Sequence, residues 1–130
     1  MKRIAVLVTL VGGLVAASVA PASATDPALG QWRGEGVGFH VAHTQHGTAY
    51  VSSAHWHAQT AFHRADIHDR TFETCARHRI SAVLARDTCL VGHFTSQHEA
   101  QGTTRIYQVA HGHRASHPSE THHWSATVSG

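Results

Sequence analysis

The sequence predicts a small all-β domain, an antiparallel barrel or sandwich held by one disulfide. Several short segments alternate apolar with polar residues and are separated by turn residues, a pattern typical of sandwiches and barrels. Glycines recur at every second position within Leu29–His40, where they leave a bare stripe on one face of a strand. The only cysteines are Cys75 and Cys89, which in an exported protein predicts one disulfide bond.

Residues 1–24 have the layout of a secretory signal peptide. Lys2 and Arg3 give a basic start, an apolar run follows, and the small residues 22–24 form a cleavage site. The run is short and interrupted by glycine, whereas a membrane span needs about 20 apolar residues, so an uncleaved anchor is the less favoured alternative. We therefore expect residues 25–130 to be one secreted, extracellular domain of a bacterium, with no membrane contact after cleavage.

The charge of the mature chain argues against a nucleic-acid partner. The formal net charge of +2 comes from Lys2 and Arg3, so residues 25–130 carry eight arginines and eight carboxylates. A nucleic-acid binder normally has a basic excess for phosphate groups. All 15 histidines follow the leader, and because histidine ordinarily titrates near pH ~6.5, the net charge should rise steeply in acid.

The glycine-rich segment is predicted to start the sheet. We expect one strand from Trp32 to about Ala42, with the tryptophan at the end of the glycine stripe, and a turn at 43–47. The next strand lies within 48–60, where alanine and tryptophan alternate with histidine and glutamine. Residues 62–70 are dense in charge and should form an exposed connection.

Residues 71–87 fit either a helix or strands, and the cysteines favour strands. Apolar residues recur there at helical spacing, but a continuous helix would separate Cys75 and Cys89 by about 20 Å. A disulfide needs Cα atoms within roughly 7 Å, so we expect a hairpin, with a turn at Arg86-Asp87. The bridge would close a loop of about 15 residues and stabilise the fold by roughly 3 kcal/mol.

The rest of the chain carries three further strand patterns. We expect strands at 88–96 and 103–111, then an irregular stretch, then a last strand at 124–128 that returns to pair with the first. This closing pair would complete a barrel or a sandwich.

Leu29–Gly38 resembles the opening strand of calycin barrels. Lipocalins carry a Gly-x-Trp motif there, as at residues 30–32, and nitrobindin-like proteins extend it with alternating glycines. The resemblance implies a barrel that encloses a small hydrophobic ligand, or haem held by a histidine late in the chain. His111 and His113 are the candidate positions for that histidine.

A second resemblance points to another class of function. Residues 117–122 (HPSETH), followed by 125–128 (SATV), are similar to a segment of lactococcin-type secreted bacteriocins. This resemblance implies a protein-directed toxin. A protease inhibitor belongs to the same competing class, in which the partner is a secreted protein.

Histidine supplies the main candidates for a metal site. His55/His57 and His111/His113 are i, i+2 pairs, and a strand places such residues on one face. With a third ligand from a neighbouring strand, either pair would suit zinc, copper or nickel. The alternative is a set of scattered surface histidines with no specific site.

Three aromatic residues are candidates for lining a ligand cavity: Trp32, Trp56 and Tyr107. Core packing is the alternative for the tryptophans. No Gly-x-Ser-x-Gly motif frames a serine, and nothing in the sequence sets the geometry of the carboxylates, so catalysis is less favoured than binding. We therefore expect a secreted binding module for a small apolar ligand, a transition metal or haem. The competing hypothesis is an agent directed at another secreted protein.

Overall fold

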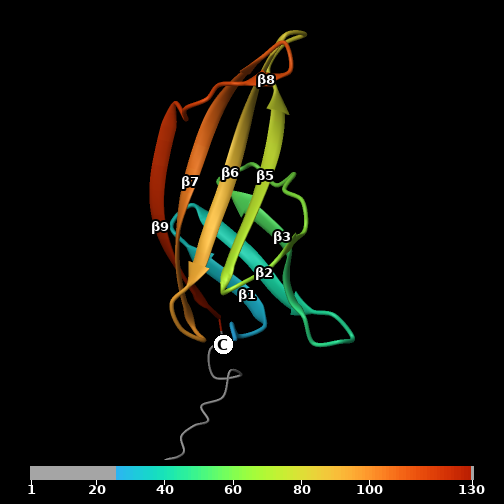
Figure 1. Cartoon of the computed structure of the whole chain (residues 1–130). Helices are drawn as coiled ribbons and strands as arrows, with labels where there is room; N and C mark the ends of the chain where they lie inside the picture. The colour runs from blue at the N-terminus through green and yellow to red at the C-terminus, as the bar shows by residue number, and fades with distance from the viewer. Residues whose placement is uncertain (1–25, 130) are drawn as a thin grey trace, which may run out of the picture.

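A computed structural model describes residues 26–129, and these form one nearly closed antiparallel barrel (Figure 1). The predicted signal peptide lies outside the described residues. Over residues 26–129 no helix forms, and hence none that is long and apolar enough to span a membrane. The strands are β1 (Gly30–Gly34), β2 (Val37–His43), β3 (Ala49–Trp56), β4 (Ala65–Asp66), β5 (Thr71–Arg79), β6 (Leu84–Phe94), β7 (Glu99–Ala110), β8 (His113–Arg114) and β9 (Glu120–Val128).

The strands follow one another around the barrel in nearly the order of the chain. Hydrogen-bonded neighbours run β4-β3-β2-β1-β9-β7-β6-β5, and the short β8 pairs with the end of β7. The return of β9 to β1 places Trp32 opposite Val128 and Gly34 opposite Ala126. The predicted pairing of the last strand with the first is therefore confirmed. The predicted all-β fold with one disulfide is confirmed as well, and its form is the barrel.

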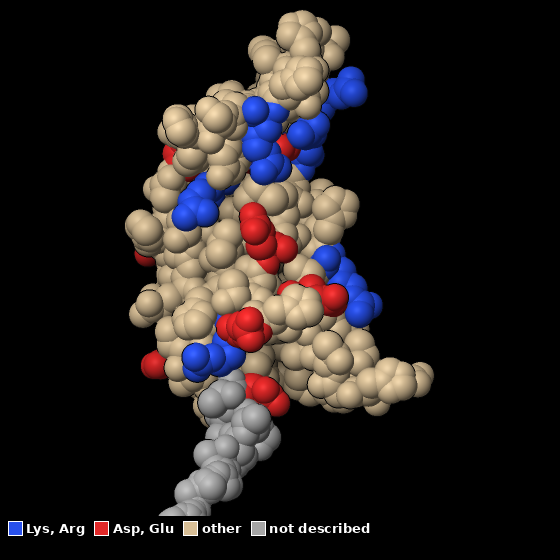
Figure 2. Space-filling view, in the orientation of Figure 1, with Lys and Arg blue, Asp and Glu red and all other residues tan. Residues whose placement is uncertain are grey.

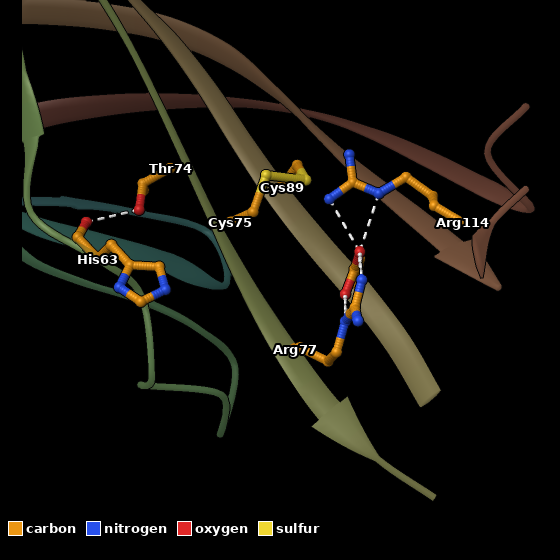
Figure 3. The surroundings of a disulfide bond; sticks show 7 residues. His63, Thr74, Cys75, Arg77, Cys89 and Arg114 are labelled. Atoms are coloured by element: carbon orange, nitrogen blue, oxygen red, sulfur yellow. Dashed lines mark hydrogen bonds and ion pairs between the residues drawn. A yellow bond between two sulfur atoms is a disulfide. The ribbon is translucent and has the colours of Figure 1, made fainter. Parts of the chain in front are cut away.

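The barrel is incompletely closed between β4 and β5. These strands contact one another, but within residues 26–129 no strand pairing joins them. The connection between β3 and β4 bridges the gap, because the Thr74 hydroxyl donates a hydrogen bond to the carbonyl oxygen of His63 (Figure 3). Arg70, in the turn that joins β4 to β5, is held by β6, because its carbonyl oxygen accepts a hydrogen bond from the amide of Phe94 at 2.8 Å.

The glycine-rich segment forms two strands, so the prediction of one strand from Trp32 to Ala42 is wrong. A two-residue turn joins β1 to β2, and it depends on Gly36, whose φ of +76° favours glycine. At Gly34 a β-carbon would collide with the backbone carbonyl of Ser125 on β9. At Gly34 the backbone of a neighbouring strand therefore comes as close as the glycine pattern predicted, although the chain reverses immediately after this residue.

β5 and β6 form the hairpin that the cysteine spacing predicted. Cys75 pairs directly with Cys89 at a Cα separation of 4.0 Å, and the two are joined by a disulfide. The turn of this hairpin lies at residues 80–83, so the predicted turn at 86–87 is wrong. Arg86 and Asp87 belong to β6 instead, where they pair with β5, and the Asp87 carboxylate is bound by arginines of β5 and β8.

Aromatic side chains fill the lower half of the barrel. The Phe39 ring lies at their centre, with centroid distances of 5.7 Å to Trp32, 5.0 Å to Phe72, 6.0 Å to Phe94 and 5.9 Å to Trp124. All five residues are buried. Inward-facing glycines of β6 and β7 make room for two of these rings. We call this part of the barrel the closed half, and its interior is packed core.

Candidate functional site

Above the closed half, the barrel is open on one side. β1 ends where Gly34 lies opposite Ala126, whereas β9 continues along β7 as far as Glu120. The four long strands β5, β6, β7 and β9 therefore rise past β1–β3 as a curved sheet, which Figure 1 shows. We call this part the open half. Its concave inner face continues the inner face of the closed half.

A cavity of about 350 Å³ lies on the inner face of the open half. It sits between the turn that follows β3 and the inner faces of β5–β7. We call it the cup. Its lining residues are Trp56, His57, Ala58, Gln59, His78, Arg86, Thr88 and Ile106.

One wall of the cup is aromatic and held in place by a tight turn. The amide of Trp56 donates to the carbonyl oxygen of Gln59 and the amide of Gln59 donates back, each at 2.9 Å. His57 has a left-handed φ of 51°, and its ring meets the half-buried Trp56 ring edge-on at 4.7 Å. On another side the Trp56 ring lies 5.5 Å from His122 of β9. The indole is therefore a positioned apolar surface.

The facing wall carries a cation. His78 of β5 pairs with Arg86 of β6 across the strands, and both line the cup. Within residues 26–129, the ion pairs do not involve Arg86. Its guanidinium is thus available to an acidic group on a ligand, for which arginine offers two parallel hydrogen bonds. Just below it, Ile106 adds a buried apolar surface.

The rim of the open half on the β9 side is polar. Glu120 and His122 lie two residues apart on the inward face of β9, with Oε1 and Nε2 3.0 Å apart. At the level of His122, its strand partner Thr104 on β7 is fully buried, and in the described part of the chain the Thr104 hydroxyl has no hydrogen-bond partner. An unsatisfied buried hydroxyl costs about 1–3 kcal/mol. Thr104 and His122 thus lie at the boundary between the apolar core of the closed half and the polar cup.

The four histidines predicted as metal ligands do not come together. His55 packs over Gly38 and His57 over Gly36, so the first pair covers the glycine segment. β7 ends at Ala110, so the strand predicted to include His111 stops before it; that residue lies in a turn, and His113 is exposed on β8. Residues 26–129 contain no group of three or more His, Cys, Asp or Glu placed to hold a metal ion.

The three aromatic candidates lie in three different environments. Trp32 is fully buried in the closed half, where its indole NH donates to the carbonyl oxygen of Ala28 at 3.0 Å. Tyr107 lies on β7 beneath Arg114, whose guanidinium carbon is 4.9 Å from the ring centroid. Of the three, only Trp56 lines the cup.

Sequence reasoning missed the cationic wall of the cup. The alternation within β6 places Arg86, Thr88 and Leu90 on one face, and this pattern was the available signal. The predicted turn at 86–87 concealed it, because a turn residue has no assigned face. His78 was missed for the same reason, since its facing depends on the pairing of β5 with β6.

A second cluster of charged residues braces the outer face of the open half (Figure 3). The Asp87 carboxylate, only 3% exposed, accepts hydrogen bonds from Arg77 Nε at 2.7 Å and from Arg114 Nε at 2.8 Å. The bond from Arg77 holds the pKa of Asp87 below its usual range, although burial of the carboxyl opposes that shift. The cluster joins β5, β6 and β8, and we assign it a structural role.

Comparison with known proteins gives no match to a family model, a curated protein or a solved structure. The calycin and bacteriocin resemblances remain predictions that rest on short segments of the sequence.

Proposed function

We propose that this chain is a secreted binding protein that holds a small amphipathic molecule in the cup. The ligand would place an aromatic ring or a short apolar chain against Trp56 and Ile106. An acidic group, such as a carboxylate, would meet Arg86. The observation that carries this proposal is the placement of Arg86, which takes no part in the ion pairs among residues 26–129, opposite a positioned indole across a cavity of about 350 Å³.

The size and lining of the cup support a small-molecule ligand. Sites for small molecules are commonly about 300–1,000 Å³ and combine apolar walls with a few polar groups that orient the ligand. The cup has this composition, with Ile106 and Trp56 as apolar surfaces and Arg86, His78 and Thr88 as polar ones. The aromatic core below the cup limits how deep a ligand reaches, so we expect a compact ligand.

Export is part of the proposal and is supported by the sequence and by the disulfide. Residues 1–24 have the pattern of a leader, and disulfides persist mainly in oxidising compartments outside the cytosol. A secreted binding role also agrees with a fold whose stabilising cross-link lies away from the cup.

The test is a titration of the purified protein with 1-anilinonaphthalene-8-sulfonate, which joins an apolar ring system to one anionic group. We expect saturable binding at one site, followed by fluorescence of the probe. Arg86→Gln should weaken it at least tenfold, and Trp56→Ala should weaken binding of both this probe and an uncharged analogue. Displacement by aromatic and short-chain fatty carboxylates then identifies the ligand class.

Arg105→Gln is the matched control. Arg105 is an exposed arginine of β7 whose strand partner is Cys89, so it lies outside the cup. Equal affinity of the wild type, Arg86→Gln and Trp56→Ala would refute the cup as the site. Zinc, copper, nickel and haem belong in the same titration, because His57 and His78 line the cavity. A tight metal or haem complex without probe binding would replace our proposal with a histidine-held ligand.

A further inference from the structure

We propose that the tip of the β5–β6 hairpin docks this protein onto a membrane surface rich in acidic phospholipids. The apolar tip consists of Ile80, Val83 and Leu84, whose exposed fractions are 50%, 47% and 47%. Figure 1 shows this hairpin at the upper end of the barrel, where it projects together with the adjoining β7–β8 turn. Docking through the apolar tip does not involve the cup and requires no ligand in it.

The composition of the tip is unusual for a hairpin turn. Exposed turns are commonly built from glycine, proline, asparagine, aspartate and serine, which supply the backbone geometry or local hydrogen bonds. Residues 80–83 are instead Ile-Ser-Ala-Val, and a leucine follows. Single exposed apolar residues need no explanation, but a projecting group bordered by polar residues marks an interaction site.

Hydrogen bonds hold the tip so that its apolar side chains stay outside. The Ser81 hydroxyl accepts from the amides of Val83 at 3.3 Å and Leu84 at 3.1 Å. The carbonyl oxygen of Val83 accepts from the amide of His111 at 2.7 Å, which ties this turn to the β7–β8 turn. The apolar surface therefore exists before any partner binds, and docking would order little additional chain.

The charge around the tip is positive, although the net charge of the described chain is zero with histidine neutral. The part of the barrel at and above the level of the disulfide contains five arginines but only two carboxylates. One of these carboxylates, Asp87, is buried between two of the arginines. The part of the described chain below that level contains three arginines and six carboxylates. The upper arginines are Arg77, Arg79, Arg86, Arg105 and Arg114.

Figure 2 shows this separation, with arginine side chains gathered over the upper strands and most of the visible carboxylates lower down. An acidic surface would attract the upper end of the molecule and repel the lower end. The protein would therefore approach such a surface with the tip first. Arginine heads near the tip would then meet lipid phosphates while Ile80, Val83 and Leu84 enter the interface. This charge complementarity is why we commit to a lipid surface, in contrast to the sequence-based expectation of no membrane contact.

The test is sedimentation of the purified protein with vesicles of equal parts phosphatidylcholine and phosphatidylglycerol, compared with phosphatidylcholine alone. We expect binding to the acidic vesicles that weakens with added salt. The double variant Val83→Ser/Leu84→Ser should bind at least tenfold more weakly. Arg79→Gln should lower the affinity roughly fivefold at low salt, the effect of about one surface charge.

Leu29→Ser is the matched control, because Leu29 is 49% exposed and follows Ala28, whose amide bonds to Gln97 in the β6–β7 turn, at the end of β6 opposite the tip. It should bind acidic vesicles like the wild type. The proposal is overturned if the wild type does not sediment with acidic vesicles, or if the tip variant still does so unchanged. It is also overturned if Leu29→Ser loses as much binding, or if sedimentation velocity shows the tip joining two copies of the chain. Loss of probe binding in the cup leaves all of these outcomes unaffected.

Discussion

The two halves of the barrel use the same long strands for different purposes. In the closed half, the inner faces of β5–β7 and β9 meet β1–β3, and four aromatic rings pack around Phe39. In the open half, no sheet of the described chain faces the same strands, and their inner surface carries Arg86, His78 and Thr88 around the cup. Buried apolar area is concentrated in the first half, and polar side chains that line a cavity are found in the second.

On the outer face of the barrel, stabilising links are found in the open half. The Cys75–Cys89 disulfide and the Asp87 cluster both lie at the level of the open half. There a cavity takes the place of the aromatic core, and covalent and ionic links join β5, β6 and β8 from outside. We conclude that the open half is braced externally, which leaves its inner face available for binding.

The largest effect on stability should come from the centre of the closed half. Phe39→Ala removes the ring that contacts four other aromatic rings, so we expect the free energy of unfolding to fall by about 4 kcal/mol in urea denaturation. Phe62→Ala is the control, because that ring is only half-buried at the edge of the core. A smaller loss for Phe39→Ala than for Phe62→Ala would contradict the division into halves.

Removing the disulfide should have the next largest effect. The bridge spans 14 positions of the chain. In the double variant Cys75→Ser/Cys89→Ser the unfolded chain regains that freedom, so we expect a loss of about 3 kcal/mol. The same comparison can be made by reducing the wild type before urea denaturation. An unchanged denaturation midpoint would show that the open half does not depend on this external brace.

The Asp87 cluster should contribute less, and its contribution should depend on pH. Asp87→Asn removes the charge that two half-exposed arginines bind, so we expect a loss of about 2 kcal/mol at neutral pH. Because the pKa of Asp87 is lowered in the folded state, its stabilisation is complete above the ordinary carboxyl pKa of about 4. It is lost as the pH falls through the lower folded value.

Urea midpoints measured across acid pH would check this sign. The wild type and Asp87→Asn should differ at pH 7 and converge in strong acid. Glu73→Gln is the control, since Glu73 is an exposed carboxylate of β5 that lies outside the cluster. A difference between the wild type and Asp87→Asn that stays constant with pH would mean that the charge of Asp87 is not what stabilises the fold.

The smallest effect on stability is expected from the cup itself. Arg86→Gln removes an exposed side chain that forms no ion pair with any described residue, so the free energy of unfolding should change by less than about 0.5 kcal/mol. Arg105→Gln on β7 should change the free energy of unfolding equally little. A loss above 1 kcal/mol for Arg86→Gln alone would show that the open half needs its inner face for stability.

The sequence predicted part of the candidate site. Trp56 and His57 were among its candidates, and both line the cup, although the histidine was predicted as a metal ligand. Trp32 and Tyr107 have other roles, because an aromatic residue in a strand pattern suits a core, a cavity or an outer face equally well. Arg86 and His78 escaped prediction, since their facing depends on where the hairpin turns.

The amino-acid sequence by itself determined the β class, the hairpin around Cys75 and Cys89, and the return of the last strand to the first. Alternation, turn residues and the reach of a disulfide are local properties, so they can be read without the fold. Only the tertiary structure decided that the glycine segment reverses after Gly34, and that Arg86 faces Trp56 across a cavity. The physical reason is strand register, because a shift of one residue moves every side chain of a strand to the other face.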